Sequence, residues 1–133
     1  MAQHRPKSAK NLRGKHILIV EDHPAIGKIL KNLLAGYDHA SHAVTGKQAL
    51  EHIDRNPPDL ILLDLTLPDM SGLELARTIR RDKKMNSVPI LAMSGRGIDK
   101  VKYVEAGCDD FILKPFDETN LLDRLSKLLR RRR

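Results

Sequence analysis

The chain has 133 residues, a formal net charge of +7, 41% apolar residues and a single cysteine. This length suits one domain, and one cysteine excludes an internal disulfide and a zinc site built from several thiolates. No apolar run approaches the about 18 residues that a membrane span needs, and the first residues lack the apolar core of a signal peptide. We therefore expect a small soluble α/β domain in a reducing cytoplasm, without a membrane partner.

The positive charge is concentrated at the two ends of the chain. Residues 1–15 and 126–133 each hold five Lys or Arg and no acidic residue, which leaves 14 basic and 17 acidic residues, a net charge of −3, in 16–125. Such ends can attract nucleic-acid phosphates or acidic partners. Solvated tails around an acidic body are the favoured interpretation. We expect 1–14 to be a flexible basic arm and 130–133 a basic tail, so that nucleic acid could bind only through them.

Beyond the arm, short apolar runs alternate with segments of helical periodicity. The run HILIV (16–20) predicts a buried strand, followed by a helix near 24–35 that Gly36 ends. A weaker strand, typical of a sheet edge, follows at 39–44. Thr45 opens the next helix with the T-x-x-Q pattern of a capping box.

The middle of the chain repeats this alternation. The run LILL (60–63) predicts a third strand, and a second capping box, Ser71 to Glu74, opens a helix that includes Ile79. The run VPILAM (88–93) predicts a fourth strand. The apolar runs are short and nearly continuous, as in strands that are covered on both faces.

The last third contains two more helices and one more strand. A helix is expected around 99–106, with Gly107 as its end, then a short strand at 111–113. Asp117 caps a last helix whose leucines share one face. Five strand–helix units imply a doubly wound α/β fold, in which helices cover both faces of a parallel sheet. No linker to a second domain is evident.

Polar residues follow four of the predicted strands. In open α/β sheets, ligands bind outside the carboxyl ends of the strands, so these residues should meet at one edge. Glu21 and Asp22 follow the first strand, Asp64 the third, Ser94 and Gly95 the fourth, and Lys114 and Pro115 the fifth. The expected site therefore holds three carboxylates, one hydroxyl and one ammonium group.

This set of charges requires a cation. Two unit charges about 4 Å apart repel by about 4 kcal/mol at an effective dielectric constant near 20, so three carboxylates do not stay ionised together unaided. Lys114 supplies one positive charge, and an oxygen-ligated divalent ion such as Mg²⁺ supplies two more. Such a site can neutralise a transferring phosphoryl group while a carboxylate attacks it as the nucleophile.

The same residues lie in motifs that resemble those of the response-regulator receiver domain, the CheY-like fold. The resemblance covers about residues 15 to 130 and rests on four motifs in the same order and spacing. These motifs are VED (20–22), LLDLTLPDMSG (62–72), AMSG (92–95) and AGCDDFILKPF (106–116). The resemblance implies a receiver domain at 15–129 with five helices and a flavodoxin-like sheet of strand order 2-1-3-4-5. The implied function is phosphorelay signal transduction in a two-component system.

The resemblance also assigns a role to each acidic residue. Asp64 would accept a phosphoryl group from a histidine kinase or a His-containing phosphotransfer protein. Asp22, Asp64 and the backbone carbonyl of Thr66 would ligate Mg²⁺, with Glu21 nearby through water. Phosphorylation would shift the domain towards the state that binds an output partner, which can be a second copy of the domain.

Three further residues form the implied switch. Lys114 would contact the phosphoryl oxygens, aimed by a cis bond before Pro115. Ser94 would move towards the phosphate, and Phe111 would turn inward when it does. Phe111 lacks the hydroxyl of a tyrosine, so packing alone would decide between its inward and outward rotamers. We therefore expect a smaller or less sharply coupled switch.

Two positions beside the switch and the acceptor also carry expectations. Gly95 stands where an alanine is expected after the switch residue and adds backbone freedom. Arg96 and Thr66, two residues beyond Ser94 and Asp64, stand where side chains can shield an acyl phosphate. We hypothesise that Arg96 reaches across the pocket and alters phosphate lifetime.

Two other functions are considered. An aspartyl phosphatase of the haloacid-dehalogenase-like kind favours a second acid two residues after the nucleophile, where this chain has Thr66, and the chain also lacks a cap insertion. A nucleic-acid binder would use the basic ends, but LLRRRR is too short for a familiar DNA-binding domain and could begin a linker. We expect a phosphoacceptor without conventional substrate turnover. The sequence identifies neither the kinase nor the output, nor whether the receiver stands alone.

The histidines and the cysteine suggest no additional chemistry. The six histidines show no spacing typical of a metal site, and His39 and His42 should face opposite sides of their strand. Cys108 follows a helix end and is expected to be an inert loop or packing residue.

Overall fold

The computed structural model describes residues 14–35 and 39–130. Its five strands form one sheet of parallel strands in the order β2-β1-β3-β4-β5. The strands are β1 (His16–Val20), β2 (His39–Ala43), β3 (Leu60–Asp64), β4 (Ile90–Ser94) and β5 (Asp110–Leu113). The doubly wound, flavodoxin-like fold expected from the sequence is confirmed.

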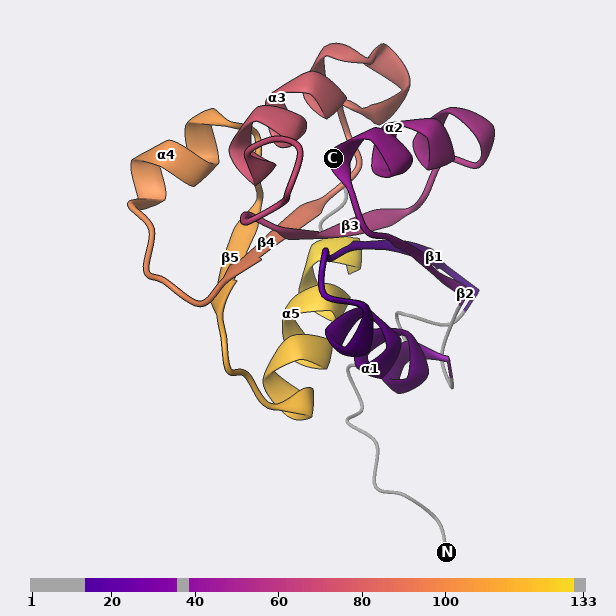
Figure 1. The fold of residues 1–133 in the computed structure, drawn as a ribbon, viewed down its shortest axis with the longest axis vertical. Helices are drawn as coiled ribbons and strands as arrows, with labels where there is room; N and C mark the ends of the chain where they lie inside the picture. Colours follow the sequence, from indigo (N-terminus) through magenta and orange to yellow (C-terminus); the bar gives the residue numbers. More distant parts are fainter. Residues whose placement is uncertain (1–13, 36–38, 131–133) are drawn as a thin grey trace, which may run out of the picture.

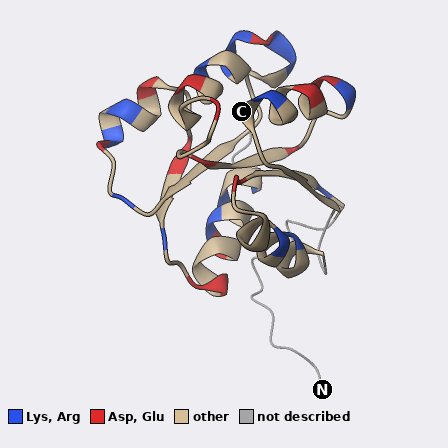
Figure 2. Ribbon diagram, in the orientation of Figure 1, with Lys and Arg blue, Asp and Glu red and all other residues tan. Residues whose placement is uncertain are grey.

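Five α-helices cover the sheet. They are α1 (Pro24–Leu34), α2 (Gly46–Arg55), α3 (Gly72–Arg81), α4 (Lys100–Glu105) and α5 (Glu118–Arg130), and a short 3₁₀ helix, η2 (Lys83–Met85), follows α3. Helices α1 and α5 lie on one face, and α2, α3 and α4 lie on the other (Figure 1). Lys/Arg and Asp/Glu are mixed over the helices, whereas the strands carry few of either (Figure 2).

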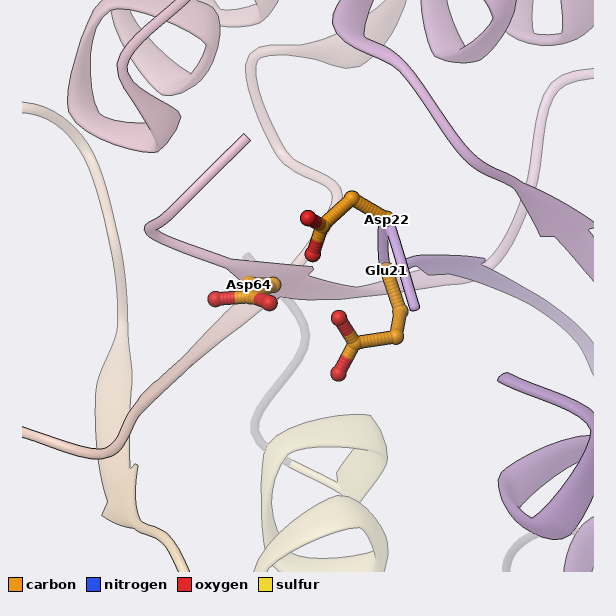
Figure 3. Close-up of side chains that lie close together, drawn as sticks. All are labelled: Glu21, Asp22 and Asp64. Carbon is orange, nitrogen blue, oxygen red and sulfur yellow. The ribbon is translucent and has the colours of Figure 1, made fainter. Parts of the chain in front are cut away.

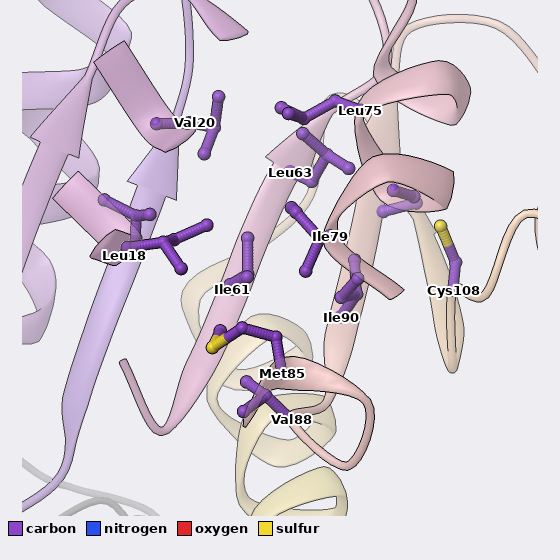
Figure 4. Packing of buried hydrophobic residues seen from close by; sticks show 14 of the residues in the cluster. Leu18, Val20, Ile61, Leu63, Leu75, Ile79, Met85, Val88, Ile90 and Cys108 are labelled. Carbon is purple, nitrogen blue, oxygen red and sulfur yellow. The ribbon is translucent and has the colours of Figure 1, made fainter. Parts of the chain in front are cut away.

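Alternate side chains of the strands fill two cores. On β1, Ile17 and Ile19 pack towards α1 and α5, while Leu18 and Val20 pack towards α2 and α3. The second core is closed at the start of the strands by Met85 of η2, among other buried apolar residues (Figure 4). A strand with both faces covered is apolar at successive positions, which explains the LILL run of β3.

Helix starts follow the predicted capping residues, with one difference in detail. The Thr45 hydroxyl accepts a hydrogen bond from the N–H of Gln48, and the Asp117 carboxylate accepts one from Asn120. At α3, the Ser71 hydroxyl accepts from the N–H of Leu73 rather than from Glu74, so the expected capping box becomes a tighter turn.

Some expected features lie outside the described residues. These are the N-terminal arm up to residue 13, the helix end at Gly36 and the last three arginines of the basic tail. In the described part of the chain, no helix has the length and apolar character needed to cross a membrane. Cys108 is buried, which confirms it as a packing residue, and burial raises the pKa of its thiol to about 12.

Candidate metal and phosphoryl site

The three acidic residues meet at the carboxyl end of the sheet. Glu21 and Asp22 follow β1, Asp64 ends β3, and their carboxylates point towards one another (Figure 3). One oxygen from each lies within 4.8 Å of the others, and within the described ranges this is the only such group of three or more His, Cys, Asp or Glu residues. Glu21 and Asp64 are buried, with 1% and 4% of their surface exposed, whereas Asp22 is open to solvent.

Lys114 reaches this cluster from the end of β5. Its Nζ lies 2.6 Å from Oε1 of Glu21 and 3.2 Å from Oδ2 of Asp64. The ammonium group thus reaches past β4 to the ends of the neighbouring strands β1 and β3. Three carboxylates and one ammonium leave a formal charge of −2, which a divalent cation would neutralise.

The electrostatics of the cluster appear in two shifted pKa values. Burial raises the pKa of Glu21 to about 7, and its contact with Asp64 adds to the rise, while Lys114 opposes it. Burial alone would lower the pKa of Lys114, but the hydrogen bond to Glu21 and the charges of Glu21 and Asp64 together raise it. The pocket therefore has an excess of negative charge, which favours a bound cation.

The loop between β3 and α3 holds Thr66 beside the acidic residues. The N–H of Thr66 donates to Oδ1 of Asp64 at 2.9 Å, which fixes that carboxylate relative to its own loop. Thr66 also pairs with Ser71 in an isolated antiparallel bridge, so the loop closes on itself. A Cβ atom on Gly72 would lie 2.4 Å from Cα of Leu65 and 2.7 Å from the carbonyl oxygen of Asp64, and the close turn therefore requires glycine.

Asp69 is a positioning residue that the sequence analysis missed. Its two carboxylate oxygens accept hydrogen bonds from the N–H groups of Gly46, at 2.9 Å, and Lys47, at 3.0 Å. The loop that carries Thr66 is therefore tied to the start of α2. Asp69 lies within the quoted LLDLTLPDMSG motif, but its partners follow a different strand, so local spacing gave no signal for them.

Ser94, Gly95 and Arg96 surround the end of β4. The Ser94 hydroxyl accepts a hydrogen bond from the N–H of Arg96 at 3.1 Å, and Ser94 is only 8% exposed. The Arg96 side chain is exposed, and nothing lies within 4 Å of a Cβ atom placed on Gly95. A methyl group on Gly95 would therefore meet no neighbouring atom.

Phe111 lies half-buried on β5, and its ring stacks on Tyr103 of α4. The ring centroids are 5.7 Å apart and the planes differ by 23°. Phe111 packs against the core shared with α2 and α3. The peptide bond between Lys114 and Pro115 is cis, as the resemblance implied.

The residues fit Mg²⁺ by the chemistry of their donors. Mg²⁺ prefers hard oxygen ligands and is commonly held by one or two carboxylates together with waters. The pocket presents carboxylates from two strand ends, one of them open to solvent, and the expected carbonyl ligand lies in the same loop as the Thr66 N–H that binds Asp64.

These features define a class: a parallel α/β protein with an acidic pocket, compatible with a cation, and a lysine at the carboxyl edge of its sheet. A family model described as the response regulator receiver domain matches residues 17–126. The chain belongs to this family.

Individual relatives agree with this assignment. The chain is 40% identical over 118 residues to the transcriptional regulatory protein BaeR of Escherichia coli, covering 86% of this chain and 48% of BaeR. It thus spans about half the length of this and other transcriptional regulators that it matches.

Solved structures show the same fold. Chemotaxis protein CheY4 of Vibrio cholerae superposes with a TM-score of 0.82 at 26% identity, covering 86% of this chain and 98% of CheY4. The receiver domain of the sensor histidine kinase PA1611 of Pseudomonas aeruginosa has a TM-score of 0.79 at 29% identity, covering 87% of this chain and 98% of its own. That structure has a magnesium ion coordinated in its active-site cleft.

Proposed function

We propose that residues 15–129 form the Mg²⁺-dependent phosphoacceptor of a two-component pathway, with Asp64 as the residue that is phosphorylated. The observation that carries this proposal is the contact between Asp64 and Lys114, at 3.2 Å, in a pocket where Glu21 and Asp22 also lie within 4.8 Å of Asp64. A nucleophilic carboxylate is thereby combined with a fixed ammonium group and with further oxygen ligands for a cation.

In the proposed reaction, a phosphohistidine of a histidine kinase or a phosphotransfer protein is the donor. An oxygen of Asp64 forms the new bond to phosphorus while the P–N bond breaks, and the imidazole nitrogen keeps the bonding electrons. Lys114 donates hydrogen bonds to the phosphoryl oxygens. Asp22, Asp64 and the Thr66 carbonyl would hold Mg²⁺, with Glu21 acting through water, and the ion when bound would neutralise charge on the phosphoryl oxygens.

The response to phosphorylation is proposed to involve Ser94 and Phe111. Ser94 moves its hydroxyl towards the phosphoryl group, and Phe111 turns inward beside it. The stack on Tyr103 supports a switch governed by packing, since Phe111 has no hydroxyl to bond in either position. The state that follows binds an output protein or a second copy of the domain, and we place this signalling in the cytoplasm.

We do not expect turnover of a substrate. An aspartyl phosphatase favours a second acid two residues after its nucleophile, and this position is occupied by Thr66, whose side chain is exposed. Hydrolysis of p-nitrophenyl phosphate beyond one equivalent per protein would contradict this part of the proposal.

The test uses acetyl phosphate as the donor and Asp64→Asn as the matched control. With Mg²⁺, the wild type should gain one phosphoryl group, read by intact mass, and the variant should gain none. Beryllofluoride should change the sedimentation or the NMR spectrum of the wild type only. Equal phosphorylation of Asp64→Asn would show that another residue is the acceptor.

A further inference from the structure

Three histidines that are far apart in the sequence lie on one face of the sheet, at the end opposite the acidic pocket. His16 begins β1, His39 begins β2, and the two are register partners, so their side chains lie on the same face. Helix α2 covers this face and brings His52 to the same place (Figure 1). Since His16 and Glu21 are separated by the length of β1, the two places lie about 16 Å apart.

The rings of His16 and His52 already face each other through their Nε2 atoms. These atoms are 3.3 Å apart, and both side chains are half-buried. Two imidazole nitrogens bound to one tetrahedral Zn²⁺, each about 2.0–2.1 Å from the metal, lie about 3.3 Å from each other. The pair therefore has the spacing of two ligands of one metal ion.

The other ring nitrogen of His16 supports the required tautomer. Nδ1 of His16 is buried without a well-formed hydrogen bond, and the Pro57 carbonyl is close enough to raise the pKa of the ring, against the larger effect of burial. A hydrogen on Nδ1 would point towards that carbonyl and leave Nε2 as an acceptor, which in the metal-free chain takes a hydrogen bond from Ser41 or His52 and which a metal ion would use instead. Metal-bound histidines commonly have this arrangement, in which a backbone carbonyl accepts from the nitrogen that does not bind the metal.

Burial of the two rings also favours the neutral form, which is the form that binds a metal ion. Burial is the largest cause of the lowered pKa of His16 and of His52, and the neighbouring ring lowers the pKa of His52 further. Neutral imidazole is the ligand form, and imidazole suits Zn²⁺, Cu²⁺ and Ni²⁺ better than Mg²⁺. This pair therefore selects a different class of cation from the acidic pocket.

We propose that His16, His52 and His39 bind a divalent transition-metal ion, with Zn²⁺ as the probe of choice. His16 and His52 form the preorganised pair. His39, the exposed register partner of His16 on the adjacent strand, is the proposed third ligand and would reach the pair through a change of its side-chain rotamer. The hydroxyl of Ser41 lies 3.0 Å from Nε2 of His16, so a water molecule bound to the ion could form a hydrogen bond with it. Binding ties together β1, β2 and α2.

The first test is a Zn²⁺ titration of ¹⁵N-histidine-labelled protein, monitored by NMR with excess Mg²⁺ occupying the acidic pocket. The ring-nitrogen signals of His16, His39 and His52 should shift together and saturate at one equivalent. Those of His42 should not, because its ring lies on the other face, 2.7 Å from the Glu21 carbonyl. Shifts confined to the acidic pocket, or no saturation, would overturn the proposal.

The second test compares the Zn²⁺ affinity of variants that all retain His16. His52→Gln and His39→Gln should each weaken binding at least about tenfold, because even the loss of a group that only supports a metal ligand costs that much. His23→Gln is the matched control, since His23 is exposed at the opposite edge of the sheet. Unchanged Mg²⁺ affinity shows that each variant is folded. Unchanged Zn²⁺ affinity in either ligand variant would refute a three-histidine site.

Discussion

Asp69 shows how a residue outside the pocket can set the pocket's geometry. Its carboxylate joins the loop after β3 to the first two N–H groups of α2. These hydrogen bonds, above all the one from Gly46, lower the pKa of Asp69. The same loop holds Thr66, which contacts Asp64 through its backbone. Removing the tie should therefore affect the metal site at a distance.

We expect Asp69→Ala to weaken Mg²⁺ binding by up to about tenfold. This is the lower end of the loss in affinity that follows removal of a residue that positions a metal ligand without binding the metal. Titration of the wild type and the variant with Mg²⁺ measures the effect. Asp82→Ala is the control, because Asp82 also caps a backbone N–H, that of Lys84, but does so at η2. Equal losses in the two variants would indicate general loosening of the fold.

A substitution of Arg96 tests whether one side chain controls the lifetime of the phosphorylated state. Its backbone N–H binds the Ser94 hydroxyl, and this bond survives in Arg96→Ala, so the variant removes the side chain alone. The exposed guanidinium can shield an acyl phosphate from water. We expect dephosphorylation to become about two to ten times faster in the variant, following the loss of one charged contact of about 0.5–1.4 kcal/mol. Identical rates would dismiss the hypothesis.

At the scale of elements, the close approach of α3 to β3 depends on Gly72. A Cβ atom there would overlap backbone atoms of Leu65 and Asp64, which cannot rotate away as a flexible side chain can. Gly72→Ala should lower the free energy of unfolding by about 1–3 kcal/mol, as overpacking does, and should also displace Asp64. Urea denaturation and Mg²⁺ titration measure the two effects.

Gly95→Ala is the matched control for this substitution. Nothing lies within 4 Å of the added Cβ atom, and the backbone of Gly95 is not in the left-handed region. The change should be neutral or raise the free energy of unfolding by about 0.4–1 kcal/mol through the unfolded state. A loss as large as that of Gly72→Ala would mean that backbone freedom, rather than packing, is what both glycines provide.

The elements themselves could be predicted from the sequence because their signals are local. The apolar runs, the capping residues Thr45 and Asp117, and Gly107 with its positive φ of 99° mark strands and helix ends within a few positions. The strand-end rule then brings Asp64 and Lys114 to one edge. The fourth strand runs from Ile90 to Ser94 rather than over 88–93: its start lies two residues later, because Pro89 precedes the hydrogen-bonded ladder, and its end lies one residue later.

The features that could not be predicted join residues across elements. The tie from Asp69 to α2 depends on how the loop after β3 folds back, and the pairing of His16 with His52 depends on how α2 lies across β1. The histidine positions have no common spacing, since their proximity follows from strand register and helix placement. For the same reason η2, which brings Met85 into the core, had no local signal.

At the scale of the whole molecule, the parallel sheet separates two ligand chemistries. All strands run in one direction, so their carboxyl ends gather the hard oxygen ligands Glu21, Asp22 and Asp64. The opposite end gathers the imidazoles of His16 and His52. Because β1 contributes to both, a metal ion bound at either end would also stabilise the folded sheet.

This linkage leads to a prediction for the metal-free protein. Glu21 has a pKa of about 7 in the folded chain and an ordinary value of 4.5. Between these values the folded state binds more protons than the unfolded state, so stability falls as pH rises. The lowered pKa values of His16 and His52 act in the opposite direction near neutral pH, and a comparison with Glu21→Gln removes their contribution.

In EDTA, the wild type should lose about 1–2 kcal/mol relative to Glu21→Gln between pH 5.5 and pH 8, measured by urea denaturation at each pH. Saturating Mg²⁺ should stabilise the wild type more at pH 8 than at pH 5.5, because the cation removes the repulsion that ionised Glu21 meets from Asp64. Lys114 does not change this sign, since its raised pKa keeps it charged throughout the range. Parallel pH profiles of the two proteins in EDTA would mean that Glu21 ionises normally and that the pocket is not short of positive charge.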